Sequence, residues 1–172
     1  MPRPLRVVLA VVVAAVALSA CLPATTAENG RLADSSLTTI SPSCRVVNEI
    51  APDLQQMIAD ANAAGYKLQP ETKSYSLVEP PTLESCYRSY DGQVWWRRYY
   101  CSTGHCELAA TPGTSKHGLG RAVDFQDQNG ELAFTSPGYA WLTKNAARFG
   151  FVQPVAMQQG GASAEAWHWE VQ

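Results

Sequence analysis

The sequence contains little charge and no run of basic residues. Charged residues make up 16% of its 172 residues, and the formal net charge is −2. Proteins that bind nucleic acids by neutralising phosphates carry a basic patch, so this class is excluded. Glycine and proline, with 12 and 11 residues, are near their ordinary level, which excludes collagenous and low-complexity chains. Apolar residues reach 46%, enough for a real core, and this excludes global disorder.

The N-terminus has the pattern of an export signal. Residues 1–6 carry two positive charges and no negative ones, and the uncharged stretch from Val7 to Ala20 follows. As a helix this stretch would be about 21 Å long, short of a hydrocarbon core of about 30 Å. The pattern therefore predicts a secretory signal peptide over residues 1–20, with a transmembrane anchor as the alternative.

A cysteine stands where this signal ends. Leu18-Ser19-Ala20-Cys21 resembles the lipobox of bacterial lipoproteins, in which the cysteine after the cleavage site receives lipid. The resemblance implies acyl chains on Cys21, which would hold the protein on the outer face of the cytoplasmic membrane without a spanning helix. The alternative is ordinary cleavage beside an incidental cysteine. Residues 21–43 are rich in Ser, Thr, Ala and Pro and are expected to form a flexible tether, with the folded domain at 44–172.

The four remaining cysteines indicate two disulfides, because the protein is expected to be exported. Four cysteines allow three pairings. We favour Cys101–Cys106, since these two are close in sequence, which leaves Cys44–Cys86. A rival interpretation of the first pair is a structural zinc site that includes His105. Adjacent His105 and Cys106 fit one tetrahedral ion poorly, so we expect His105 to be solvated.

Short expected strands separated by helices and long loops predict a single α+β domain over residues 44–172, with a small antiparallel sheet flanked by helices. Apolar residues at helical spacing predict a helix from Val47 to Ala61, with Pro52 in its first turn. Further helices are expected over residues 136–148 and 90–99. The expected strands are Leu83–Arg88, Arg121–Phe125, Phe151–Val152 and Trp167–Val171, and residues 70–81 are expected to form a loop.

Two of the three histidines lie in sequences suited to metal binding. His117 precedes a Gly-x-Gly turn that can fold its imidazole toward Asp124. On an extended chain, small residues share the face of Asp124 and leave space beside its carboxylate. His168 lies in the expected terminal strand. Two imidazoles and one carboxylate suit Zn²⁺ and leave a fourth position for water, which favours catalysis over a structural role.

Two acidic residues flank His168. Glu165 is the natural general base, but on a regular strand it would point away from His168, so the chain must bend at Glu165–Ala166. Glu170 shares a strand face with His168. It either supports this ligand through a hydrogen bond or is exposed at the chain end.

Three ordered segments between residues 83 and 171 contain these side chains. They read Tyr87-Arg88-Ser89-Tyr90 with Gln93, then Ser115-x-His117-x-x-Gly120-x-Ala122-x-Asp124, and then Glu165-x-Trp167-His168. Together they resemble the signatures of the VanY-type zinc D-alanyl-D-alanine carboxypeptidases. Two features depart from the family pattern: Glu84-Ser85-Cys86 stands where Ser-Gly is common, and the Cys101/Cys106 pair is added. Both leave the shape of the substrate groove open.

The resemblance implies a Hedgehog/D,D-peptidase-like zinc peptidase fold with one Zn²⁺ per chain. His117, Asp124 and His168 would bind the ion. Glu165 would accept a proton from the attacking water and pass it to the leaving amine. Arg88 would face the substrate carboxylate or the developing oxyanion.

The resemblance also implies that Ser115 and Gln93 hydrogen-bond the terminal D-residue of the substrate. The expected function is removal of the terminal D-Ala from peptidoglycan stem peptides by a membrane-anchored monomer, with no nucleic-acid partner. An L,D-carboxypeptidase or a cell-wall endopeptidase could use the same site. A wall-binding lipoprotein with a structural metal is the alternative of another class, but a pure binder has no need for Glu165.

Aromatic residues are concentrated between residues 90 and 100. We expect them to form core and groove wall, and the alternative is a glycan-binding surface. The residues are Trp95, Trp96, Tyr99 and Tyr100.

Overall fold

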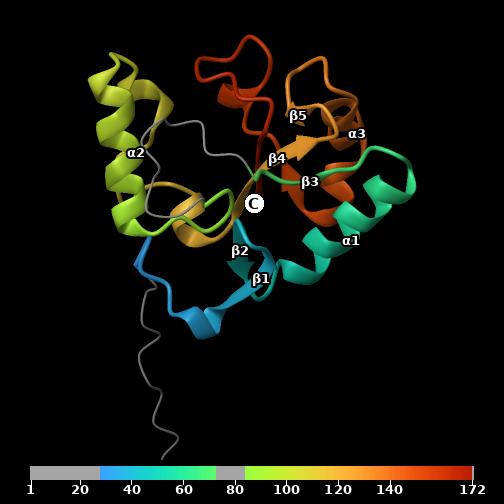
Figure 1. The fold of residues 1–172 in the computed structure, drawn as a ribbon, viewed down its shortest axis with the longest axis horizontal. Helices are drawn as coiled ribbons and strands as arrows, with labels where there is room; N and C mark the ends of the chain where they lie inside the picture. Colours follow the sequence, from blue (N-terminus) through green and yellow to red (C-terminus); the bar gives the residue numbers. More distant parts are fainter. Residues whose placement is uncertain (1–27, 73–83, 172) are drawn as a thin grey trace, which may run out of the picture.

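The computed structural model describes residues 28–72 and 84–171 and has the predicted α+β architecture (Figure 1). An antiparallel sheet has the strand order β3-β4-β7-β6, with β5 beside β4, and β1 and β2 form a separate hairpin. The strands are β1 Leu37–Ser41, β2 Cys44–Val47, β3 Gln69–Pro70, β4 Ala122–Asp127, β5 Gly130–Glu131, β6 Phe151–Val152 and β7 His168–Val171. The α-helices are α1 Ala51–Ala63, α2 Tyr90–Ser102 and α3 Pro137–Asn145, and the 3₁₀ helices are η1 Asp34–Ser36, η2 Cys106–Leu108, η3 His117–Leu119, η4 Ala146–Phe149 and η5 Val155–Met157.

Helix α1 supplies one side of the core through Leu54, Met57 and Ala61, all fully buried. The sequence predicted its apolar face but not its start. The chain from Cys44 to Val47 is strand β2, and the helix begins at Ala51, where Pro52 fits the first turn because no N–H is needed there. Helix α3 was predicted as one helix to residue 148, but its last turn is the separate 3₁₀ helix η4.

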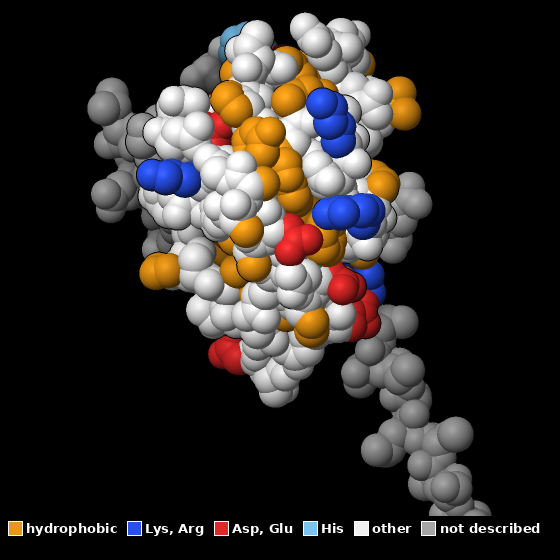
Figure 2. Space-filling model, turned by 90° about the vertical axis from the view of Figure 1, so that its right-hand side faces the viewer, with side chains coloured by type: hydrophobic (Ala, Val, Ile, Leu, Met, Phe, Trp, Pro, Cys, Tyr) orange, Lys and Arg blue, Asp and Glu red, His pale blue; other side chains and the backbone are white. Residues whose placement is uncertain are grey.

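Aromatic side chains pack between α1 and α3. The ring centroids of Tyr66 and Trp141 lie 6.3 Å apart, and those of Trp141 and Phe149 lie 6.5 Å apart. Figure 2 shows the side of the molecule that carries α1 and α3, where apolar side chains reach the surface between charges of both signs. In Figure 1, α2 lies on the other side of β4.

The predicted tether is wrong for residues 28–43, because this segment is folded into the domain. Strand β1 pairs antiparallel with β2, with Leu37 opposite Val47. The N–H of Gly30 donates to the carbonyl of Gly118 at 2.7 Å. The Ser/Thr content suggested a tether, but Leu-Thr-Thr-Ile is rich in β-branched residues that favour a strand. The signal peptide, Cys21 and the first residues of the expected tether lie outside the described residues.

A strand over Leu83–Arg88 was also expected, and residues 84–88 are irregular instead. They run between two strands: the Tyr87 N–H donates to Arg45 O of β2 at 2.7 Å, and Ser85 O accepts from Asp124 N of β4 at 2.8 Å. The Cys44–Cys86 disulfide joins this segment to β2, and the Cys101–Cys106 disulfide joins the end of α2 to η2. Both pairings agree with those favoured from the sequence. No helix in the described ranges is long and apolar enough to cross a membrane.

Candidate metal centre and its pocket

Strand pairing brings two of the three expected metal ligands together. Asp124 of β4 and His168 of β7 are direct cross-strand partners, so their side chains lie on the same face of the sheet. His117 reaches them from η3, which ends at Gly120. Gly120 has φ +64°, a left-handed conformation that glycine adopts without strain, and there the chain turns toward β4. All three side chains are buried.

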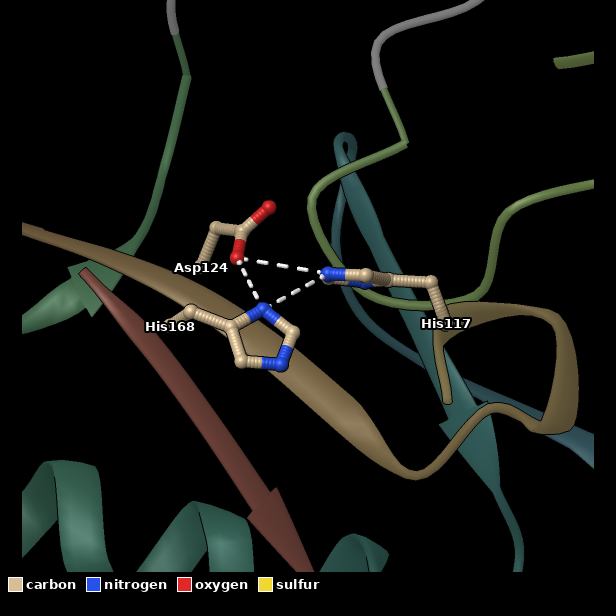
Figure 3. Close-up of side chains that lie close together, drawn as sticks. All are labelled: His117, Asp124 and His168. Atoms are coloured by element: carbon tan, nitrogen blue, oxygen red, sulfur yellow. Dashed lines mark hydrogen bonds and ion pairs between the residues drawn. The ribbon is translucent and has the colours of Figure 1, made fainter. Parts of the chain in front are cut away.

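The three side chains point one ligand atom each at a common centre (Figure 3). His117 Nε2 lies 3.1 Å from His168 Nδ1 and 3.3 Å from Asp124 Oδ1, and His168 Nδ1 lies 3.0 Å from Asp124 Oδ1. Tetrahedral ligands at the usual zinc distance of about 2.0–2.1 Å lie about 3.3 Å from one another. The triangle in this structure has nearly those edges, so the residues fit a zinc ion with little rearrangement.

The opposite nitrogen of each imidazole is held by a hydrogen bond. His117 Nδ1 lies 2.7 Å from Cys86 O, and since a carbonyl only accepts, Nδ1 donates and Nε2 keeps its lone pair for a metal. His168 Nε2 donates to Glu170 Oε1 at 3.0 Å, which turns Nδ1 toward Asp124. Glu170 is therefore a half-buried support for the ligand, the first of the two roles considered from the sequence.

Burial and mutual contact set the charge states of the ligands. Burial lowers the pKa of His117, which favours the neutral imidazole that binds metals. Burial opposes the charge of Asp124, yet the imidazoles of His117 and His168 hold its pKa well below the usual range. Burial also lowers the pKa of His168, but hydrogen bonds to Asp124 and Glu170 outweigh it and raise the pKa to about 9. Metal binding at Nδ1 therefore displaces a proton from His168.

Glu165 lies in the same pocket as the three ligands, a cavity of about 250 Å³. The expected bend is present: the His168 N–H donates to Glu165 O at 3.3 Å, which closes a turn before β7 begins. Gln153 Nε2 donates to the same carbonyl at 2.9 Å and fixes the turn. Burial, and next the charge of Asp124, raise the pKa of Glu165 to about 7, which suits a general base near neutral pH.

Arg88 brings a cation to the pocket wall. Its Nη2 lies 3.4 Å from Asp124 Oδ2 and donates to Glu84 O at 3.4 Å, and its guanidinium carbon lies 5.8 Å from the centre of the Trp96 ring. Its Nε is buried and has no hydrogen-bond partner among the described residues. A guanidinium in the wall of this pocket suits a bound carboxylate, which it can hold with two parallel bonds.

Comparison with known proteins identifies the family. A family model described as VanY, D-alanyl-D-alanine carboxypeptidase, matches residues 43–171. The chain belongs to the VanY family. A D-alanyl-D-alanine carboxypeptidase of Enterococcus faecalis is 31% identical over 118 residues, which are 67% of this chain and 34% of the relative. The chain thus spans about a third of the length of this curated relative.

Solved structures of VanY proteins share the fold. VanYB in complex with D-alanine-D-alanine is 26% identical, with a TM-score of 0.58 over 78% of this chain and 76% of the other. A mutant of the vancomycin resistance D,D-pentapeptidase VanY in complex with Zn(II) is 27% identical, with a TM-score of 0.58 over 78% and 77%. The LdcB LD-carboxypeptidase, at 23% identity and a TM-score of 0.61 over 83% and 70%, shows the same fold. The expected zinc peptidase fold is confirmed.

The other two VanY signature residues have different environments. Ser115 lines the pocket, and its Oγ accepts from the His117 N–H at 3.2 Å, so the hydroxyl proton remains available to a substrate. Gln93 is 3% exposed and is not among the residues that line the pocket. Its amide bonds to Asn29 and Arg88 through Nε2 and to Gly113 through Oε1. This geometry therefore does not favour the direct substrate binding by Gln93 that the resemblance implied.

One pocket wall was not anticipated from the VanY signatures. Trp96 and Tyr100 of α2 line the pocket together with residues 107–110, which the Cys101–Cys106 disulfide joins to α2. Trp96 and Tyr100 thus form groove wall, whereas Trp95 and Tyr99 are not among the residues that line the pocket. His105 is exposed and lies 3.3 Å from Glu107, and the disulfide leaves no thiolate for the rival zinc site considered above. The sequence signals for this wall were the aromatic cluster of residues 95–100 and the added cysteine pair.

Proposed function

We propose that this protein is a zinc-dependent D,D-carboxypeptidase that removes the terminal D-Ala from peptidoglycan stem peptides, acting as a monomer. The convergence of three ligand atoms within 3.0–3.3 Å in a pocket that also holds Glu165 carries the proposal. A structural zinc site fills its four positions with protein ligands, whereas the described residues offer three here. Membership of the VanY family supplies the substrate class.

His117, Asp124 and His168 would hold the ion. When bound, zinc activates water near neutral pH and polarises the scissile carbonyl. Glu165 accepts the proton of the attacking water and passes it to the amine of the departing D-Ala. In the metal-free protein, burial raises the pKa of Glu165 to about 7, which makes it a better proton acceptor than an exposed carboxylate.

Arg88 gives the site its preference for a chain end. The terminal D-Ala carries a free carboxylate, and the guanidinium is the pocket side chain best suited to bind it. Ser115, whose hydroxyl proton is available, is the second expected donor to the terminal residue.

The test is incubation of the zinc-loaded protein with synthetic stem tri-, tetra- and pentapeptides, the last ending in D-Ala-D-Ala. We expect one D-Ala to be released from the pentapeptide and the tetrapeptide to remain intact. Release from the tetrapeptide alone would mean an L,D-carboxypeptidase. Cleavage of cross-linked peptides without release of a terminal residue would mean an endopeptidase, and no turnover of any of them by zinc-loaded protein would refute an enzymatic function.

We also propose that Cys21 is lipidated and that the domain is held at the outer face of the cytoplasmic membrane. The lipobox resemblance supports this, and the N-terminal hydrogen bonds of the domain add a length limit. Asn29 is already bonded to the domain, and Cys21 is eight residues earlier. Eight residues span at most about 28 Å, so the pocket would act on substrate close to the membrane.

Labelling with radioactive palmitate in a bacterial host tests the anchor. We expect label in the wild type and none in Cys21→Ala, with the variant found in the soluble fraction. Absence of label from the wild type would refute lipidation without affecting the proposed activity.

A further inference from the structure

Asn29 joins the N-terminal segment to the loop that carries a metal ligand. Its Nδ2 donates to Ser115 O at 2.7 Å, and its Oδ1 accepts from Gln93 Nε2 at 3.1 Å. The neighbouring Gly30 adds two backbone bonds, from its own N–H to Gly118 O and from Tyr90 N–H to its carbonyl. Residues 29–30 are thus bound between the His117 loop and the first turn of α2.

Gln93 extends this link to the cationic side of the pocket. Its Nε2 also donates to Arg88 O at 3.3 Å, and its Oε1 accepts from the Gly113 N–H at 2.8 Å. The Arg88 N–H in turn donates to His117 O at 3.0 Å. The two amide side chains therefore connect the backbone of Arg88 with the part of the loop that precedes His117, and the Gly30 N–H binds the part that follows it.

The amide pair lies directly against the backbone next to His117. A Cβ added to Gly118 would lie 1.8 Å from Asn29 Oδ1 and 2.3 Å from Gln93 Nε2, so any side chain there would displace the two amides. Gly30, at φ +83°, is equally confined, since an added Cβ would lie 2.6 Å from the nitrogen of Tyr90. Such close packing leaves the His117 loop little freedom while the amides are in place.

We infer that Asn29 and Gln93 are positioning residues, which hold His117 and Arg88 at the spacing that the metal centre and the substrate carboxylate require. Neither amide lines the pocket, so both act through the groups they orient. The activity readout depends on the proposed function, whereas the metal readouts do not. The inference also gives residues 29–30 a role, because their hydrogen bonds hold the His117 loop.

The test compares Asn29→Ala with Asn48→Ala in the full domain. Asn48 is a matched control, because it also holds the N-terminal segment through two side-chain hydrogen bonds. Its Nδ2 donates to Ser35 O and its Oδ1 accepts from Thr38 Oγ1, but it is not among the residues that line the pocket. Three quantities are measured: zinc affinity by chelator competition, the visible spectrum of the cobalt-substituted protein, and kcat and KM on the stem pentapeptide.

For Asn29→Ala we expect about tenfold weaker zinc binding, an altered cobalt spectrum and about tenfold lower kcat/KM, the low end of the range for groups that orient ligands. Asn48→Ala should change the melting temperature only. Gln93→Glu, which keeps the acceptor for Gly113 and loses the donor to Asn29, should resemble Asn29→Ala. The double variant should be no worse than the poorer single variant, because both break one link.

The inference is overturned if Asn29→Ala and Gln93→Glu bind zinc as tightly as the wild type and show the wild-type cobalt spectrum. It is also overturned if Asn48→Ala perturbs the metal centre equally, since the effect would then be one of general stability. If the wild type hydrolyses no stem peptide while Asn29→Ala still alters the cobalt spectrum, the positioning role stands and the proposed function fails.

Discussion

Replacement of Glu165 by glutamine isolates its role as a proton acceptor. Glutamine has nearly the same shape, and the turn at residue 165 is held through its backbone carbonyl by Gln153 and His168, so the variant should keep the fold. Loss of general base catalysis typically lowers kcat by 10²–10⁴-fold, which corresponds to about 3–5 kcal/mol of transition-state stabilisation. Zinc affinity should change little, because Glu165 is not one of the three ligands.

The same substitution has a measurable effect on stability in the metal-free protein. Because the folded-state pKa of Glu165 is raised to about 7, folding is favoured while the carboxyl is protonated, and this advantage is lost as pH rises from about 4.5 through 7. Glu165→Gln should therefore raise the free energy of unfolding at pH 8 by about 1–3 kcal/mol, after allowance for partial exposure, and leave it unchanged at pH 4.

The assay is D-Ala release from the stem pentapeptide by zinc-loaded protein, with zinc content measured on the same samples. Glu49→Gln is the control, since it removes one surface carboxylate away from this pocket and should alter kcat less than twofold. A Glu165→Gln variant with bound zinc and kcat within threefold of the wild type would refute the assigned role.

Three further predictions follow from the same geometry. The kcat/KM of the wild type should fall about tenfold per pH unit on the acid side, because Glu165 must be deprotonated to act as a base. The apparent pKa should lie below the metal-free value of about 7, since a bound cation favours the carboxylate, and a profile that stays flat down to about pH 4 would contradict this. Glu170→Gln should weaken zinc binding about 10–100-fold in chelator competition, because His168 loses the carboxylate that orients it, and unchanged affinity would exclude that support. Arg88→Ala should raise KM for the pentapeptide at least tenfold while zinc content stays the same, and an unchanged KM would show that the guanidinium does not bind the terminal carboxylate.

The metal centre could be predicted because its geometry follows from local rules. Alternation along β4 places Asp124 opposite His168 once the two strands pair, and the glycine after η3 allows His117 to turn back toward them. Glu165 required a bend, and Gly160 and Gly161 shortly before it made that bend plausible. Each of these inferences depends on a few neighbouring residues and one strand pairing.

Other features depended on contacts that composition does not encode. The segment from residue 28 to 43 resembles a tether by its Ser and Thr content, but residues 37–41 within it pair with β2 as a strand. A motif gives the residue type at Gln93 but not the direction of its amide, which Asn29 and Gly113 fix. Residues 84–88 have a strand-like pattern, yet a disulfide and bonds to two different strands keep them irregular.

The zinc coordination itself is the most direct test of the account. X-ray absorption at the zinc edge, on purified protein with one zinc per chain, should show only nitrogen and oxygen neighbours at about 2.0–2.1 Å, with the outer-shell signal of two imidazoles. Sulfur neighbours at about 2.3 Å, or loss of zinc from the wild type but not from a His117→Ala/His168→Ala variant on dialysis, would contradict a metal centre formed by His117, Asp124 and His168.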